Sequence, residues 1–215
     1  MAAPAAPMSG RKAQAARNDE VILDAARAVF IADPGAPVSA VATAAGVGMS
    51  ALYRRYPSKE DLLRRLCTIG LESYVGIAED CLADDGDPWE AFATFMRRQV
   101  ESGSNALTLK LAGTFTPNQE LYELAEYAGT LNVRLFDRTA ATGMLRPDVT
   151  VSDLGLLLEQ VAAISFGATA ARNVTLRLRC MELLLDGMRT EAARGELPGP
   201  TVTDEEFAAR WVPRT

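Results

Sequence analysis

Histidine is absent from the 215-residue sequence, and cysteine is scarce. Without imidazole, the chain has no histidine-ligated metal site and no histidine general acid or base. Cys67, Cys81 and Cys180 are odd in number, and their spacing fits neither a disulfide framework nor a zinc site. The sequence has no run of 18 apolar residues and no apolar leader, so we expect a reduced, cytoplasmic protein that has no membrane partner.

Signatures of catalysis and of cofactor binding are also missing. There is no glycine-rich phosphate loop, and the carboxylates cluster in segments expected at the surface. The acidic run Asp80, Asp84, Asp85 and Asp87 lacks the spacing of a calcium-binding loop, so it is interpreted as a solvated turn. We therefore expect no metal, no cofactor and no enzymatic activity, with an all-helical enzyme as a distant alternative.

Charge is distributed unevenly along a chain that is 48% apolar and can bury a sizeable core. Up to Arg65 there are nine basic against six acidic residues, whereas the remainder has thirteen against twenty-two. The overall charge of −6 is thus compatible with a polyanionic partner, because only the docking face has to be positive.

Apolar residues recur at helical spacing, and no alternating strand pattern is present, which predicts an all-α fold. Beyond the first 57 residues, breakers and caps divide the chain into expected helices at 58–83, 88–102, 104–115, 117–141, 152–170 and 174–194. We expect an arm at 1–17, a three-helix domain at 18–65, a larger helical domain at 66–195 and a tail at 196–215. The Ala- and Pro-rich arm is interpreted as disordered, or alternatively as a basic segment that contacts phosphate.

The segment 41–62 predicts two short helices joined by a tight turn, with a capped third helix following. Val38, Val41, Ala42 and Ala45 form an apolar stripe, and Gly46 provides the left-handed residue that ends this helix. The next helix, 49–56, directs Leu52 inward and stops at Pro57. Ser58 and Asp61 then resemble a capping box. This is the layout of a helix-turn-helix that reads DNA.

Three sequence pieces within Asn18 to Leu66 resemble the N-terminal domain of TetR/AcrR-family transcriptional regulators. Their order and spacing make the resemblance specific. Ala36 with Pro37, and Gly48, depart from the family pattern, in which hydroxyl-bearing caps are usual. The matching residues are Ile22, Leu23, Ala25, Ala26 and Phe30, then Ala42, Ala45, Gly46 and Val47, then Leu52, Tyr53, Tyr56, Ser58, Lys59 and Glu60.

The outward side of the helix at 49–56 gives the candidate DNA contacts. Ser50, Ala51, Arg54 and Arg55 are expected to project toward base or groove edges. The resemblance implies that Tyr53, Tyr56 and Lys59 hold the phosphate backbone of a double-stranded operator.

The last two expected helices favour a homodimer. In 174–188, one apolar face holds Val174, Leu178, Met181, Leu185 and Met188, and a second holds Leu176, Cys180, Leu183, Leu184 and Gly187. Two apolar faces require two packing partners, which are either a second subunit or the remainder of a larger monomeric core. The resemblance implies that these helices pair across a two-fold axis.

The resemblance also implies a cavity for a small-molecule effector between the DNA-binding domain and the dimer helices. Mostly apolar residues are its candidate lining, although core packing is the alternative for each of them. The resulting hypothesis is a repressor released from a palindromic operator by a small, largely apolar molecule. The alternative is a DNA-binding protein with a filled helical core, which is either independent of any effector or controlled by a partner. The candidate lining residues are Trp89, Phe92, Phe95, Met96, Gln99, Thr108, Phe115, Tyr127 and Phe166.

Overall fold

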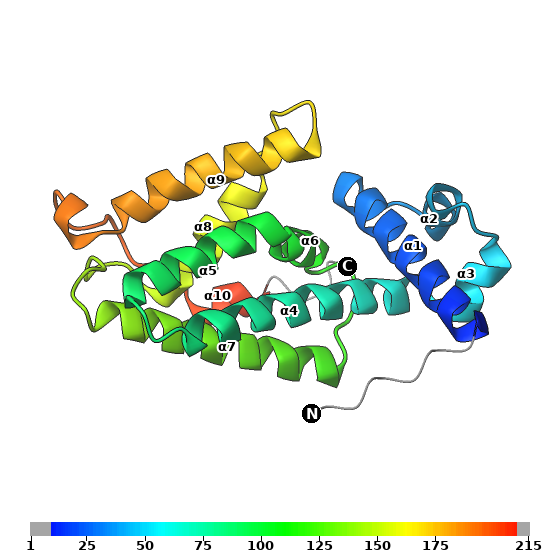
Figure 1. Ribbon diagram of the computed structural model, residues 1–215, viewed down its shortest axis with the longest axis horizontal. Coiled ribbons are helices and arrows are strands. Elements are labelled where there is room, and N and C mark those ends of the chain that lie inside the picture. The colour runs from blue at the N-terminus through cyan, green and yellow to red at the C-terminus, as the bar shows by residue number, and fades with distance from the viewer. Residues whose placement is uncertain (1–9, 210–215) are drawn as a thin grey trace. The chain divides into compact units, whose positions relative to one another are not determined.

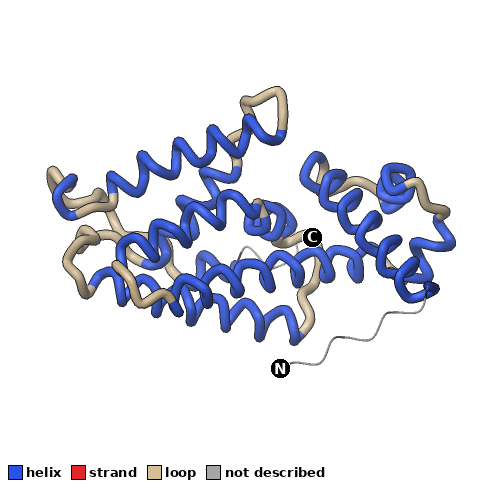
Figure 2. Tube along the Cα trace, viewed as in Figure 1, coloured by secondary structure: helices blue, strands red, loops and turns tan. Residues whose placement is uncertain are grey.

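The described part of the chain is entirely helical apart from its turns and loops (Figure 2). The computed structural model describes residues 10–209, without the side chains of residues 10–16, 104–106, 109, 204, 207 and 208. It divides into a unit up to Leu66 and a unit from Cys67 onward. The helices are α1 (Gly10–Ala32), α2 (Val38–Ala45), α3 (Met49–Arg55), α4 (Lys59–Ala83), α5 (Pro88–Ser102), α6 (Ser104–Leu111), α7 (Gln119–Ala140), α8 (Val151–Ala162), α9 (Ala170–Gly187), a 3-10 turn (Thr190–Ala192) and α10 (Asp204–Ala209).

Some expected boundaries were wrong. Helix α1 begins at Gly10, so residues 10–17 of the expected arm are helical, and residues 1–9 lie outside the described part. Helices α6 and α8 end at Leu111 and Ala162, earlier than expected, and α9 begins at Ala170. The capped ends of α5 were placed well, whereas the start of α9 was missed although the Thr169 hydroxyl caps it.

Helix α5 shows how local chemistry defines both ends of an element. The Asp87 carboxylate accepts a hydrogen bond from the Glu90 backbone N–H at 3.0 Å, and Pro88 follows at the first helical position. Gly103 ends the helix with φ of 61°, a left-handed conformation that glycine adopts without a Cβ penalty. These caps explain why the expected range 88–102 agrees with the structure.

The N-terminal unit packs around the residues that carried the first family motif. Ile22, Ala26 and Phe30 on α1 are at most 3% exposed, and Val41 of α2 and Leu52 of α3 are completely buried. Helix α1 packs against α2, and α2 contacts α3 across the turn. The first turns of α4 add further apolar side chains, Leu62, Leu63 and Leu66.

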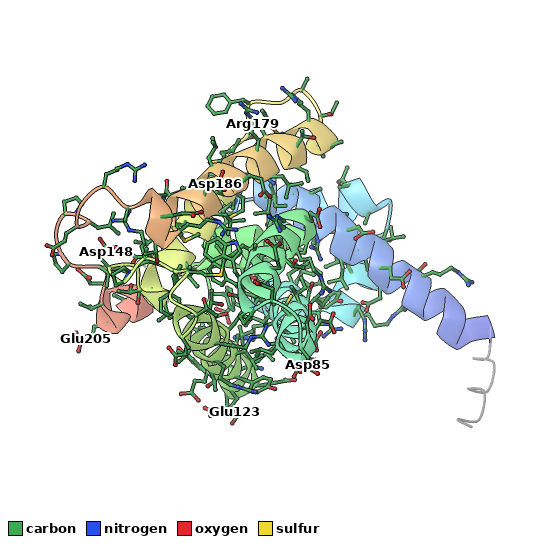
Figure 3. The ribbon with its side chains drawn as sticks, turned by 60° about the vertical axis from the view of Figure 1, so that its left-hand side comes forward. Asp85, Glu123, Asp148, Arg179, Asp186 and Glu205 are labelled. Atoms are coloured by element: carbon green, nitrogen blue, oxygen red, sulfur yellow. The ribbon has the colours of Figure 1, made fainter. Side chains whose placement is uncertain are left out.

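Helix α5 is the centre of the C-terminal unit, where it packs against α6, α7, α8 and α9 (Figure 1). Its buried residues form one broad side of the helix, whereas Glu90, Thr94 and Glu101 form an exposed side, as expected for an element covered by several neighbours but open to solvent along one stripe. Arg138 of α7 closes the end of α4 by donating to the carbonyl oxygens of Cys81, Leu82 and Asp84 at 3.0–3.1 Å. Charged side chains such as Asp85, Glu123 and Glu205 lie at the periphery (Figure 3).

Candidate DNA-binding surface and ligand core

The turn between α2 and α3 has the geometry that the sequence predicts. Gly46 has φ of 65°, and the backbone N–H of Val47 donates to the Ala42 carbonyl oxygen at 3.0 Å. Gly48 precedes α3 in extended conformation and makes no side-chain cap. At α4, the Ser58 hydroxyl accepts from the Asp61 N–H at 3.1 Å, so the expected cap is confirmed.

Helix α3 presents a short polar and aromatic surface. Ser50 and Arg54 are exposed, Ala51 is half-exposed, and the Tyr53 side chain is 45% exposed. Met49 is 38% exposed and adds an apolar side chain to the same side of the helix. We call Met49, Ser50, Ala51, Tyr53 and Arg54 the α3 surface.

Arg55 and Tyr56, two of the candidate DNA contacts, both hydrogen-bond to Asp19 inside the N-terminal unit. Arg55 donates from Nε and Nη2 to the two carboxylate oxygens of Asp19 on α1, at 2.7 and 2.8 Å. The Tyr56 hydroxyl donates to Asp19 Oδ1 at 2.7 Å, and Tyr56 is only 5% exposed. A buried tyrosine with a committed hydroxyl does not reach a phosphate. Sequence reasoning missed Asp19 because its partner Arg55 is 36 residues away.

The electrostatics of this cluster favour its charged, hydrogen-bonded form. The Arg55 guanidinium holds the pKa of the Asp19 carboxyl below its ordinary value. Partial burial, together with donation to Asp19, raises the pKa of Tyr56, so its hydroxyl keeps its proton. The carboxylate of Asp19 therefore joins α1 to the end of α3 at neutral pH.

Lys59 was also expected to contact phosphate, and the structure gives it a different role. Its Nζ donates to the carbonyl oxygens of Pro34, Gly35 and Ala36 at 3.2, 3.2 and 2.8 Å. It also lies 5.2 Å from the ring centroid of Phe30. Because an ammonium has three protons, these bonds use its whole donor capacity. Lys59 fastens the start of α4 to the loop that precedes α2.

Most of the predicted effector residues lie together in the interior of the C-terminal unit. Trp89, Phe92, Phe95, Met96, Gln99, Thr108 and Phe115 are all at most 5% exposed. Helix α5 carries the first five of them, and α6 carries Thr108. This arrangement is a packed aromatic core around α5.

Two candidate effector residues, Phe166 and Tyr127, lie outside this core. Phe166 is 91% exposed in the loop between α8 and α9, because α8 ends before reaching it. Tyr127 is 44% exposed on α7, and its hydroxyl donates to the Glu79 carboxylate at 2.7 Å. Neither side chain points into the interior of the C-terminal unit.

A few polar groups are buried within the core. The Tyr74 hydroxyl donates to Asn132 Oδ1 at 2.8 Å, and burial raises the pKa of Tyr74. Gln99 Nε2 donates to the Tyr74 backbone carbonyl at 3.3 Å. Burial raises the pKa of the Cys67 thiol to about 12, although a hydrogen bond with Thr108 acts in the opposite direction. Cys67 is therefore an unreactive thiol at neutral pH.

Helix α9 separates its two predicted apolar faces only in part. Met181, Leu185 and Met188 are buried against the rest of the C-terminal unit, at 4% exposure or less. From the second predicted face, Cys180 and Leu184 also pack partly against this core. Leu183 on that face is 65% exposed, and Arg179 lies on the outer side of the helix (Figure 3).

Neither a metal-binding cluster nor a membrane-spanning helix is present among the described residues. No group of three or more Cys, Asp or Glu side chains there is arranged to hold a metal ion. None of the helices in this part of the chain is both long and apolar enough to cross a membrane.

Comparisons with known proteins agree with this architecture. Residues 22–66 match the model of bacterial regulatory proteins of the tetR family, and residues 87–190 match the C-terminal domain of SbtR-like transcriptional regulators. The HTH-type transcriptional repressor LfrR of Mycolicibacterium smegmatis is 48% identical over 50 residues, which are 23% of this chain and 26% of that protein. The matched segment therefore spans about a quarter of that relative.

Solved structures extend the similarity over most of the chain. The TetR-like regulator LfrR from Mycobacterium smegmatis, in complex with proflavine, has a TM-score of 0.63 at 23% identity, covering 85% of this chain and 99% of that one. A TetR transcription regulatory protein from Mycobacterium vanbaalenii has a TM-score of 0.52 at 27% identity, with coverages of 83% and 98%.

These matches agree with the two units of the structure, a helix-turn-helix unit and a helical unit built around α5. Together they define a class of protein, the bacterial transcriptional regulators that combine an N-terminal DNA-binding domain with a C-terminal helical domain. The chain belongs to the TetR family of transcriptional regulators. Members of this family are DNA-binding regulators and not enzymes.

Proposed function

We propose that this protein is a homodimeric repressor that leaves a palindromic operator when a small, largely apolar molecule binds its C-terminal unit. The observation that carries the proposal is the α3 surface, which follows the left-handed turn at Gly46 and leaves Tyr53 and Arg54 exposed. A helix of this kind enters the major groove and reads base edges with its outward side chains.

A homodimer follows from the need to read both halves of a palindromic operator. Two α3 surfaces have to reach half-sites about 34 Å apart, which one subunit does not provide. The outward side of α9 supports pairing of two subunits, because Leu183 is 65% exposed there whereas Met181 and Leu185 on the opposite side are buried. Pairing of α8 and α9 with their copies would bury this face in a four-helix bundle.

Coupling between effector and operator would pass through α4. This helix begins at Lys59, whose ammonium holds the loop before α2, and it continues to Ala83 beside α5 and α7. Binding of an effector against α5 favours one of two discrete arrangements of α4. A coupling free energy of about 1–3 kcal/mol is sufficient for regulation.

One observation favours a second candidate function. Seven of the nine predicted effector residues are at most 5% exposed, as in a core that is already filled. A regulator with such a core would bind DNA without responding to a small molecule. Thermal-shift screening separates the two candidates, because binding to the folded state raises the melting temperature by an amount that grows with ligand concentration.

DNA binding itself is tested by anisotropy titration of labelled duplexes that carry an inverted repeat from the DNA beside the gene. We expect Arg54→Ala to weaken binding and change sequence preference, with a loss of about 1–3 kcal/mol for a base contact. The matched control is Arg134→Ala, which removes an exposed arginine from α7. Equal affinity of both variants for every duplex would exclude Arg54 from the interface.

A further inference from the structure

Gln99 carries a buried oxygen for which the described residues offer no partner. The side chain is on α5 and is 2% exposed. Its Nε2 donates to the backbone carbonyl oxygen of Tyr74 at 3.3 Å, whereas Oε1 is buried and accepts no hydrogen bond. Most buried side-chain oxygens in native proteins accept a hydrogen bond, and where no protein group donates it, a water molecule or a ligand usually does.

The orientation of the amide is fixed by its neighbour. If the amide were turned over, Oε1 would face the Tyr74 carbonyl oxygen, and two acceptors would meet without a proton between them. The nitrogen therefore belongs beside Tyr74, and the oxygen is the atom left over. Two neighbouring hydroxyls are already used, since Tyr74 donates to Asn132 and Ser102 donates to the Gln99 backbone carbonyl oxygen.

Aromatic and apolar side chains lie on the same side of α5 as Gln99. Phe95 and Met96 precede Gln99 by one helical turn, so they share its side of α5. The Tyr74 and Phe95 rings meet edge to face, with centroids 5.4 Å apart. A single directional acceptor within a mostly apolar and aromatic environment is the usual composition of a small-molecule site.

We propose, on the basis of the effector-binding function proposed above, that Gln99 Oε1 is the hydrogen-bond acceptor that selects the effector. The effector is then an uncharged, ring-containing molecule with one hydroxyl or N–H donor. A charged group brought against Phe95 and Met96 would lose its hydration without a compensating partner. An ether or ester would bring a second acceptor and leave the oxygen of Gln99 unpaired.

Matched ligand pairs that differ only in the donor test this assignment. Isothermal titration calorimetry on the full chain compares carbazole with N-methylcarbazole and β-naphthol with its methyl ether, and β-naphthoate serves as the charged counterpart. We expect the donor-bearing member of a pair to bind about 5- to 150-fold more tightly, the range for one buried unsatisfied group. The carboxylate should bind least.

The key variant is Gln99→Met, which keeps a flexible side chain of similar length and removes both amide atoms. It should bind both members of a pair with equal affinity. The control, Gln119→Met, removes an exposed amide on α7 that hydrogen-bonds to Glu123, and it should keep the preference for the donor. In the absence of ligand, Gln99→Met should melt at or above the temperature of the parent protein, because it removes an unpaired buried acceptor.

The outcomes separate this assignment from the proposed function. Equal binding of both members by the parent protein, or a preference that survives in Gln99→Met, overturns the assignment and leaves an effector-responsive repressor. A lower melting temperature for Gln99→Met than for Gln119→Met shows that the oxygen is already satisfied in the free protein, which also overturns it. If no pair binds while operator binding is intact, the effector function and this assignment both fail.

Discussion

Asp19 and Arg55 form a two-point ion pair that joins the first helix to the end of the DNA-reading helix. Nε and Nη2 of the guanidinium lie 2.7 and 2.8 Å from the two carboxylate oxygens. Paired geometry of this kind fixes orientation as well as distance. An arginine that the sequence suggests for DNA thus positions α3 within its own unit.

Removing the Asp19 charge should destabilise the N-terminal unit. We expect Asp19→Asn to lower the free energy of unfolding by about 1–2 kcal/mol at neutral pH, because the charge-assisted bonds are partly exposed to solvent. The pKa of Asp19 is lowered in the folded state, so its contribution is present above the unfolded value near 3.8 and is lost as the pH falls through the folded pKa. Denaturant unfolding at several pH values measures this, with the exposed Asp24→Asn as the control. Parallel pH profiles for the parent and Asp19→Asn would contradict the expectation.

Lys59→Met should affect stability and not the salt dependence of operator binding. The methionine keeps an apolar stem beside Phe30 but removes three bonds to loop carbonyls, at a cost of about 1–3 kcal/mol. A lysine that neutralised a phosphate would instead reduce the slope of log K against log salt by about one. Titrations at a series of salt concentrations decide between the two roles. A flatter slope of log K against log salt, with unchanged stability, would show instead that Lys59 contacts a phosphate.

The turn before α3 should require glycine at position 46 only because of its left-handed backbone conformation. A Cβ at Gly46 would meet nothing within 4 Å, but φ is 65° there, so Gly46→Ala should cost about 1–2 kcal/mol. Gly129 is exposed in the middle of α7, also with open space around it, and Gly129→Ala should stabilise the chain by about 0.5–1 kcal/mol. Melting curves of the two variants should therefore move in opposite directions. Shifts of the same sign would show that the left-handed conformation is not required.

The outward face of α9 should determine the oligomeric state. Leu183→Glu places a charge at the centre of the proposed dimer contact, and we expect the dimer dissociation constant to rise by about a hundredfold or more. Val133→Glu adds the same charge at a 45% exposed position on α7 and should leave the dimer intact. Sedimentation equilibrium measures both. If the dimer is equally stable in the two variants, the dimer interface does not include Leu183.

The sequence predicts elements well where a few neighbouring residues decide the outcome. Gly46 and the pair Asp87 with Gly103 set boundaries that agree with the structure, because caps and left-handed residues act over one turn. The end of α8 is different. Its apolar period continues past Ala162, but the following loop is held by side chains from α9.

The loop between α8 and α9 explains why Phe166 is exposed and does not lie in the core. Asn173 accepts from the Gly167 N–H at 2.6 Å, and Arg177 donates to the Ile164 carbonyl oxygen at 3.0 Å. These bonds satisfy the backbone without a helix and carry Phe166 into solvent. The partners of Arg55 and Lys59 inside the unit were missed for a similar reason. A sequence shows that a cation is present, but its partner, Asp19 or the loop at 34–36, is defined only by folding.

The Lys59 ammonium joins the first residue of α4 to the peptide that leads into α2, all within the N-terminal unit. A displacement of the start of α4 would therefore pass directly to the first helix of the helix-turn-helix. Under the proposed function, a variant that lacks this contact should still bind its effector but release its operator less readily.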